Sequence, residues 1–233
     1  MVRQPGMGEY NVDIVMCIDA TGSMAPIIDE VKGNAISFYQ RFVDAMEESD
    51  KDVAQLRIKV IVFRDYGCDD EPMVESQFYT LPDQNDEFRS FVNSIEAKGG
   101  GDGPENALEA IALALKSDWT TGGSRRRHAI LVFSDAPALA LGERASSESY
   151  PSGLPADLAQ LGAWWEGTDQ TLGSTYQAKA GRLVAFVPNA EPWTELQAWS
   201  RYWPAFSPAG TGLVDVDIQS AFDLMIESFF GLF

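Results

Sequence analysis

The fold is decided by one stretch near the start of the chain, Val12-Asp13-Ile14-Val15-Met16-Cys17-Ile18-Asp19-Ala20-Thr21-Gly22-Ser23. Val12 to Ile18 is apolar except for Asp13, which is typical of a strand covered on both faces in a parallel sheet. Apolar residues then recur at spacings of three and four from Met24 to about Met46, which predicts a long helix. The stretch therefore predicts a buried strand that ends in a loop, and the loop opens a helix.

The loop carries oxygen-bearing side chains at alternate positions, Asp19, Thr21 and Ser23. One carboxylate and two hydroxyls are hard ligands with little negative charge, and they suit Mg²⁺ or Mn²⁺ better than a soft metal. The same residues also suit a simpler arrangement, in which Ser23 caps the following helix and Asp19 only ends the strand. The loop alone leaves both interpretations open.

Outside this stretch, apolar runs alternate with amphipathic segments. We expect further strands at 56–63, 73–79, 129–133, 183–187 and 203–206, and further helices at 83–97, 104–115, 156–165, 192–200 and 217–230. This alternation predicts an α/β fold with a doubly wound, mostly parallel sheet and helices on both faces. The short link before 73–79 predicts one antiparallel edge strand. We expect a single domain over 1–233, with a short tail at 1–10 and a weakly patterned, partner-specific region at 136–181.

Composition restricts the class of partner. The chain is 45% apolar and 22% charged, which is ordinary for a globular protein, but its net charge of −18 is strongly acidic. Such a surface disfavours nucleic acids and anionic membranes and favours cations and basic protein surfaces. No segment resembles a signal peptide or a membrane span. The two cysteines, Cys17 and Cys68, do not suggest a disulfide scaffold, so we expect a reducing, cytoplasmic setting.

A second strand end completes the predicted site. The apolar run 129–133 ends in Ser134-Asp135. If this strand neighbours the first one, Asp135 and Asp19 meet where open parallel sheets bind ligands. The glycine-rich loop 99–103 opens on the same edge and offers Asp102, although an aspartate there also suits unusual backbone angles. Clustered carboxylates repel one another unless a cation neutralises them. The predicted metal set is Asp19, Thr21, Ser23, Asp102 and Asp135.

These residues resemble a known family. Asp19-Ala20-Thr21-Gly22-Ser23-Met24 resembles the metal-ion-dependent adhesion site motif, Asp-x-Ser/Thr-x-Ser, of von Willebrand factor A domains. Ala129 to Asp135 resembles the later strand of that family, which ends in Thr/Ser-Asp, and Gly99 to Glu105 is similar to a glycine-rich loop of its bacterial and intracellular branches. The resemblance implies a six-stranded, Rossmann-like sheet and a divalent cation at its upper edge. It also implies a partner protein whose Asp or Glu fills the open coordination position.

Two departures from the family pattern matter. Many members have Thr where this chain offers Asp102, and the added charge implies tighter metal binding with less attraction for an acidic partner. The second departure is Asp135-Ala136-Pro137 in place of Asp-Gly, and Pro137 stiffens that loop.

Several residues outside the motif invite a functional interpretation. Asp65 ends the second strand and could orient a ligand or a water at the site, with a local turn or salt bridge as the alternative. Trp164 and Trp165 lie in the partner-specific region and could contact a partner, or they belong to the core. His128 follows three arginines, and we expect this basic stretch to be a solvated loop.

The predicted function is a non-enzymatic protein-interaction module with a Mg²⁺ or Mn²⁺ site. The resemblance extends to small cytoplasmic bacterial proteins whose relatives are associated with Ser/Thr kinases and phosphatases or with stress and tellurium resistance. The alternative is a metal-dependent phosphohydrolase of the haloacid-dehalogenase type that uses Asp19. Such an enzyme needs a second Asp two residues later, where this chain has Thr21, and it needs a lysine for which Lys98 and Lys116 are poorly placed.

Overall fold

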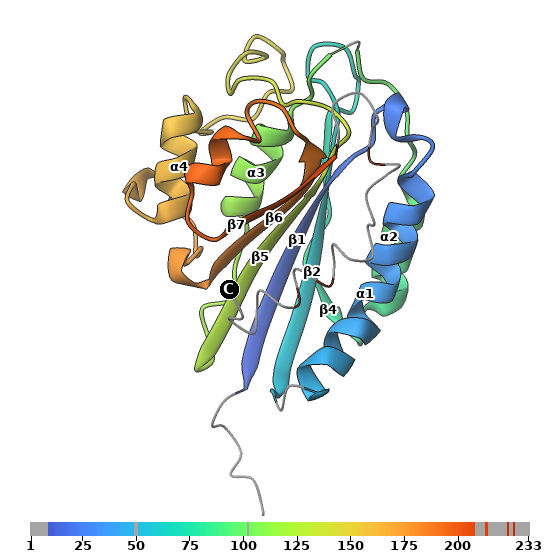
Figure 1. The fold of residues 1–233 in the computed structure, drawn as a ribbon, viewed down its shortest axis with the longest axis vertical. Helices are drawn as coiled ribbons and strands as arrows, with labels where there is room; N and C mark the ends of the chain where they lie inside the picture. Colours follow the sequence, from blue (N-terminus) through green and yellow to red (C-terminus); the bar gives the residue numbers. More distant parts are fainter. Residues whose placement is uncertain are drawn as a thin grey trace, which may run out of the picture.

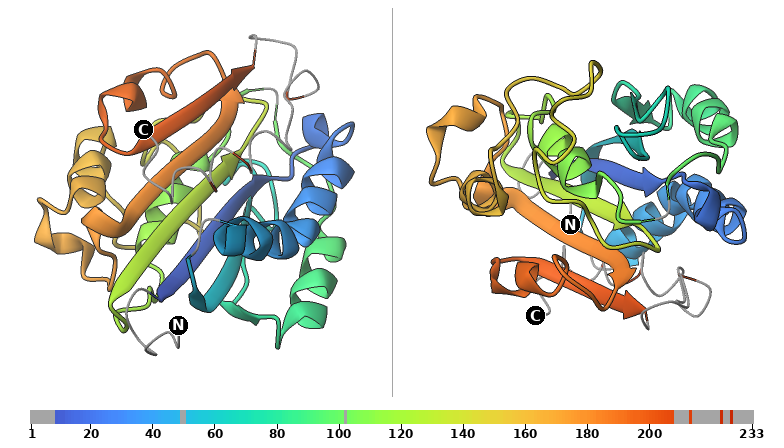
Figure 2. Two further views of the ribbon diagram at one scale, coloured as in Figure 1. Left: turned by 60° about the horizontal axis from the view of Figure 1, so that its bottom comes forward. Right: turned by 90° about the horizontal axis from the view of Figure 1, so that it is seen from above.

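The computed structural model describes residues 9–48, 51–101 and 103–207, together with Leu213, Asp223 and Ile226. Within these residues one sheet has the strand order β3-β2-β1-β5-β6-β7, and β4 also pairs with β2 (Figure 1). The strands are β1 (Tyr10–Asp19), β2 (Val53–Phe63), β3 (Met73–Glu75), β4 (Tyr79–Leu81), β5 (Arg125–Phe133), β6 (Gly181–Pro188) and β7 (Tyr202–Ser207). The five long strands β2, β1, β5, β6 and β7 are parallel. In the left view of Figure 2, β7 in red-orange, β6 in orange, β5 in yellow-green and β1 in blue lie side by side. The predicted mostly parallel α/β sheet is confirmed.

The antiparallel edge differs from the prediction in one respect. Two short strands, β3 and β4, pair with β2, where the sequence predicts a single strand over 73–79. Ser76 interrupts the ladder because its own Oγ accepts the hydrogen bond of the Val60 N–H over 2.9 Å. A side-chain acceptor in place of the next backbone carbonyl ends β3, and pairing resumes only at Tyr79.

Helices cover both faces of the sheet, as predicted. The helices α1 (Ile28–Glu48) and α2 (Asn85–Ser94) pack on one face, and α3 (Ala107–Leu115) and α4 (Leu158–Glu166) pack on the other. Alternate residues of β1 divide between the two layers, because Ile14 and Met16 belong to the first core cluster and Val15 to the second. The predicted helix at 192–200 is only a 3-10 turn, Glu195–Ala198. The predicted helix at 217–230 and the tail at 1–10 lie largely outside the described residues.

The tryptophan pair belongs to the core. Trp164 and Trp165 are 2% and 0% exposed. Their indole N–H groups donate to Thr171 Oγ1 over 3.0 Å and to the Ser200 carbonyl over 2.6 Å. The interpretation of this pair as a partner surface is corrected, because α4 turns both rings inward against the layer that contains α3.

The basic stretch before residue 129 is also corrected. It belongs to β5, which begins at Arg125, and His128 is fully buried. The His128 ring stacks on Trp119 with 4.8 Å between ring centroids. Arg125 and Arg127 are part of this strand, and each guanidinium lies over the ring of Tyr10 on the neighbouring strand β1.

In the described residues, none of the helices combines the length and the apolarity that a bilayer span requires.

Candidate metal site

The strands β1 and β5 bring the predicted residues to one edge of the sheet. They are parallel neighbours with Ile18 opposite Phe133, so the residues that follow, Asp19 and Ser134, lie side by side. Ser134 Oγ donates to Asp19 Oδ2 over 2.7 Å. From β1 the sheet continues to β2 on one side and to β5 on the other, and such a reversal of strand order is where open sheets bind ligands.

Asp19 organises the loop after β1. Its side chain is fully buried, and its Oδ1 accepts from the backbone N–H of Thr21 over 2.9 Å and from Thr21 Oγ1 over 2.7 Å. The chain then makes one 3-10 turn, Gly22–Met24, and α1 begins only at Ile28. The predicted helix start at Met24 is therefore wrong. Ser23 caps no helix here, and its hydroxyl is directed to the loop after β5 instead.

The four predicted residues that the structure describes form one hydrogen-bonded series. Thr21 Oγ1 lies 3.1 Å from Ser23 Oγ, and Ser23 Oγ donates to Asp135 Oδ1 over 2.9 Å. The series thus runs from Asp19 through Thr21 and Ser23 to Asp135. Asp102, the fifth predicted residue, lies outside the described residues, and its role stays a prediction.

The glycine-rich loop is fastened to the loop after β1. Gly22 N–H donates to the Gly99 carbonyl over 3.0 Å, and Lys98 N–H donates to the Ala20 carbonyl over 2.9 Å. Gly100 has a φ of +74°, and a Cβ atom at this position would lie 2.7 Å from Thr21 Cβ. Glycine is required here both for the backbone angle and for the close approach to Thr21.

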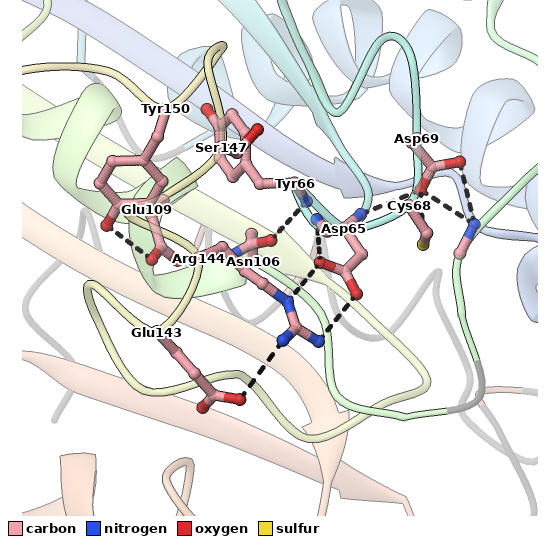
Figure 3. A network of polar contacts seen from close by, with 12 residues as sticks. Asp65, Tyr66, Cys68, Asp69, Asn106, Glu109, Glu143, Arg144, Ser147 and Tyr150 are labelled. Carbon is pink, nitrogen blue, oxygen red and sulfur yellow. Dashed lines mark hydrogen bonds and ion pairs between the residues drawn. The ribbon is translucent and has the colours of Figure 1, made fainter.

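Asp65 is engaged in an ion pair beside the site. Its carboxylate accepts from Arg144 Nε over 2.9 Å and Nη2 over 3.1 Å, and from the Gly67 N–H over 2.7 Å (Figure 3). Burial acts to raise the pKa of Asp65, but the hydrogen bonds from Arg144 and Gly67 hold it below its usual value. Among the described residues Asp65 makes no hydrogen bond to Asp19, Thr21, Ser23 or Asp135. The salt bridge and local turn account for its contacts.

A pocket of about 430 Å³ opens beside the series. Its lining includes Thr21, Ser23 and Asp135, together with Glu105 and several proline and alanine side chains. Glu105 is the last residue of the glycine-rich stretch 99–105, and it is not among the predicted site residues. The sequence signal for a role at the site is its position between the glycine-rich loop and the apolar pattern of α3, because a residue there lies at the same edge of the sheet as the loop.

The site is strongly acidic. Burial raises the pKa of Asp19 to about 6, against hydrogen bonds from Thr21 and Ser134 that lower it. Burial likewise raises the pKa of Glu105 to about 8, and nearby carboxylates, first among them Asp19, add to the rise. Within the described residues, no three side chains of the His, Cys, Asp and Glu types are grouped to hold a metal by themselves. Beside the carboxylates of Asp19 and Asp135, the hydroxyls of Thr21 and Ser23 are further oxygen donors at this edge.

Comparison with known proteins identifies the family. A family model described as von Willebrand factor A domain matches residues 13–144, which is more than half of the chain. The chain is also 27% identical over 144 residues to the alpha-protein kinase vwkA of Dictyostelium discoideum. That match covers 62% of this chain but only 21% of the kinase, so the chain spans about a fifth of that relative's length.

Solved structures agree on the fold. A von Willebrand factor type A protein from Catenulispora acidiphila superposes with a TM-score of 0.53 at 14% identity, over 94% of this chain and 42% of that one. The pilus adhesin SpaC from Lactobacillus rhamnosus GG gives a TM-score of 0.51 at 10% identity, over 96% and 30% of the two chains. At these identities the likeness concerns the fold alone.

Proposed function

The chain belongs to the von Willebrand factor A domain family, and on that premise we propose that it binds a protein partner through a divalent cation at the site just described. Domains of this family are generally non-enzymatic interaction modules. Asp19, Thr21, Ser23 and Asp135 would hold the cation at the carboxyl edge of the sheet. The observation that carries the proposal is the hydrogen-bonded series that joins these four residues across two loops.

The donor chemistry of the series fits Mg²⁺ or Mn²⁺. Each hydroxyl carries one proton, and the contacts direct the proton of Thr21 to Asp19 and that of Ser23 to Asp135. The 3.1 Å contact between the two hydroxyls is a hydrogen bond only when one of these protons turns away from its carboxylate. A cation beside them would be ligated by the lone pairs of both hydroxyls, which are hard oxygen ligands, and would leave both protons on the carboxylates.

The charges of the site also favour a divalent cation. Asp19 is fully buried, and the hydrogen bonds it receives come from neutral groups of Thr21 and Ser134. A buried carboxylate without an opposite charge is energetically unfavourable. A divalent cation supplies the missing positive charge, and the adjacent pocket leaves room for a carboxylate of the partner to complete its coordination.

The partner we propose is another protein, not a nucleic acid or a membrane, because the chain has a net charge of −18. The match to a protein named as a kinase supports a partner in phosphorylation, such as a Ser/Thr kinase or phosphatase. Cys17 and Cys68 are both free thiols, which supports a reducing, cytoplasmic setting.

A catalytic role for Asp19 is less well supported than a binding role. A haloacid-dehalogenase type of mechanism would use this carboxylate as an exposed nucleophile. Here it is fully buried, and both of its oxygens accept hydrogen bonds from neighbouring side chains. Thr21 also stands where that mechanism needs an acid/base Asp.

The experiment is a cation-controlled binding assay. The wild-type domain and an Asp135→Asn variant are immobilised, and cell extract is passed over each in Mg²⁺ and again in EDTA. We expect a partner that is retained by the wild type in Mg²⁺ and lost both in EDTA and with the variant. Binding of the purified partner that is the same in Mg²⁺ and EDTA would contradict the proposal.

A further inference from the structure

Glu105 is a buried carboxylate whose second oxygen has no partner. The residue is 3% exposed, and its Oε2 is buried without a hydrogen bond in the structure as described. It lines the same pocket as Thr21, Ser23 and Asp135. Leaving a polar oxygen buried and unpaired is costly, and more so when the carboxyl is ionised, so this position calls for a group that enters the pocket from outside.

The backbone fixes Glu105 against both loops of the site. Its N–H donates to the Pro137 carbonyl over 3.0 Å, and its carbonyl accepts from the Leu139 N–H over 2.8 Å. These bonds join it to the segment that follows Asp135. The residue therefore has little freedom to withdraw from the pocket.

The side chain of Glu105 lies close to Thr21. A Cβ atom placed on Gly100 would be 3.0 Å from Glu105 Oε1 and 2.7 Å from Thr21 Cβ. The carboxylate of Glu105 and the side chain of Thr21 therefore flank the same small glycine. This places the carboxylate beside the start of the hydrogen-bonded series.

The residues around Glu105 favour a cation, or a water bound to one, as the partner of its unpaired oxygen. The largest effects of charged side chains on it come from carboxylates, those of Asp19, Asp65, Asp69 and Asp135. Arg144, a basic side chain in the neighbouring network, is paired with Asp65 (Figure 3). An anion or a second carboxyl would add to the repulsion, whereas a cation or its bound water would satisfy the unpaired oxygen.

We propose that Glu105 belongs to the cation site, where its carboxylate accepts a hydrogen bond from a water bound to the cation. The inference rests on the proposed function. Among the described residues, Glu105 is not grouped with two other carboxylates closely enough to ligate a metal together with them, so we place a water between its carboxylate and the cation. Carboxylates that act on a metal in this way typically change its affinity about 10- to 100-fold.

The test is isothermal titration with MgCl₂ and MnCl₂ of the wild type and four variants, one of which, Ser23→Ala, tests the proposed function itself. We expect Glu105→Gln to weaken binding at least about 10-fold, and Glu105→Asp to give an intermediate affinity because it keeps the charge on a shorter side chain. Glu109→Gln is the matched control. Glu109 lies one turn further along and is also fully buried with an unpartnered Oε2, but it accepts from Tyr150 and does not line the pocket. It should keep the wild-type affinity.

Thermal melting in EDTA accompanies the titration. Glu105→Gln removes a buried carboxyl that lies among other carboxylates, so its melting temperature without metal should equal or exceed that of the wild type. If Ser23→Ala binds weakly while Glu105→Gln binds as tightly as the wild type, the inference is overturned and the proposed function stands. Equal weakening by Glu105→Gln and Glu109→Gln also overturns the inference, because it indicates a structural effect. A wild type that binds neither cation overturns both.

Discussion

Ser23 and Asp135 are joined by a 2.9 Å hydrogen bond across 112 residues of chain. The bond connects the loop after β1 to the loop after β5, the two strands between which the order of the sheet reverses. Neither loop presents the full set of oxygen atoms alone. The geometry of the site therefore depends on the register between β1 and β5, and a change in either residue should affect the whole set.

A double-mutant cycle measures this dependence. Ser23→Ala, Asp135→Asn and the double variant are melted in EDTA and in excess Mg²⁺. Because bound ligand stabilises the folded state by an amount set by its affinity, each single variant should lose most of the Mg²⁺-induced rise in melting temperature. The double variant should lose no more than either single one. Ser37→Ala, on the exposed side of α1, is the control that should keep the rise. Losses that simply add would indicate that the two residues do not share one ligand.

Gly100 should resist substitution. With a φ of +74° and Thr21 Cβ only 2.7 Å from an added Cβ, Gly100→Ala should lower the free energy of unfolding by about 1–3 kcal/mol and displace Thr21. Gly101→Ala is the matched neighbour, because its nearest atoms would be 3.7 and 3.8 Å away, in ordinary contact. Urea unfolding followed by tryptophan fluorescence compares the two. Equal stability of both variants would contradict the close packing of Gly100 on Thr21.

The ion pair between Asp65 and Arg144 should stabilise the neighbourhood of the site without being part of it. Arg144→Ala leaves a largely buried carboxylate without its cationic partner, and we expect a loss of about 1–3 kcal/mol in the free energy of unfolding. Arg144→Lys keeps the charge but loses the paired geometry, so its free energy of unfolding should lie between those of the wild type and Arg144→Ala. Arg89→Ala, on the exposed side of α2, should change little. An Arg144→Ala variant as stable as the wild type would show that solvent already screens the pair.

His128 should make stability depend on pH. Burial lowers its pKa in the folded state, although the hydrogen bond to the Thr120 carbonyl acts to raise it. The imidazole of His128 takes up a proton near pH 6.5 in the unfolded chain, whereas in the folded chain it does so only at a lower pH. As the pH falls, protonation therefore stabilises the unfolded state relative to the folded state. His128 therefore costs no stability above pH 6.5 and lowers it increasingly as the pH falls below that value.

The variant His128→Gln isolates this effect from the other titrating groups. The difference in unfolding free energy between wild type and variant is measured in urea at pH 7.5, 6.5 and 5.5. It should favour the wild type at pH 7.5 and shrink as the pH falls. A difference that stays constant over this range would mean that His128 is not kept neutral by the fold.

The sequence predicts the strands and the site residues best where local pattern is sufficient. Asp19 and Asp135 each end an apolar run, so their shared edge follows from the parallel sheet alone. The start of α1 at Ile28 is not predictable from apolar spacing, because the 3-10 turn at Gly22–Met24 keeps Met24 buried in either arrangement.

Long-range packing decides the rest. His128 is buried because Trp119 stacks on it, and Trp164 because α4 lies against the layer of α3. The importance of Glu105 depends on its bridge to the segment after Asp135, and Arg144 finds Asp65 over 79 residues of chain. No periodicity in the sequence records such contacts.

The central claim is that the loops after β1 and β5 hold one divalent cation, and electron paramagnetic resonance of Mn²⁺ tests it most directly. The signal of free Mn²⁺ is followed as wild-type protein and the Asp135→Asn variant are added in turn. We predict one bound Mn²⁺ per wild-type chain, displaced by excess Mg²⁺, and binding at least about tenfold weaker in the variant. Mn²⁺ binding of equal strength in the two proteins, or none in the wild type, would contradict the account.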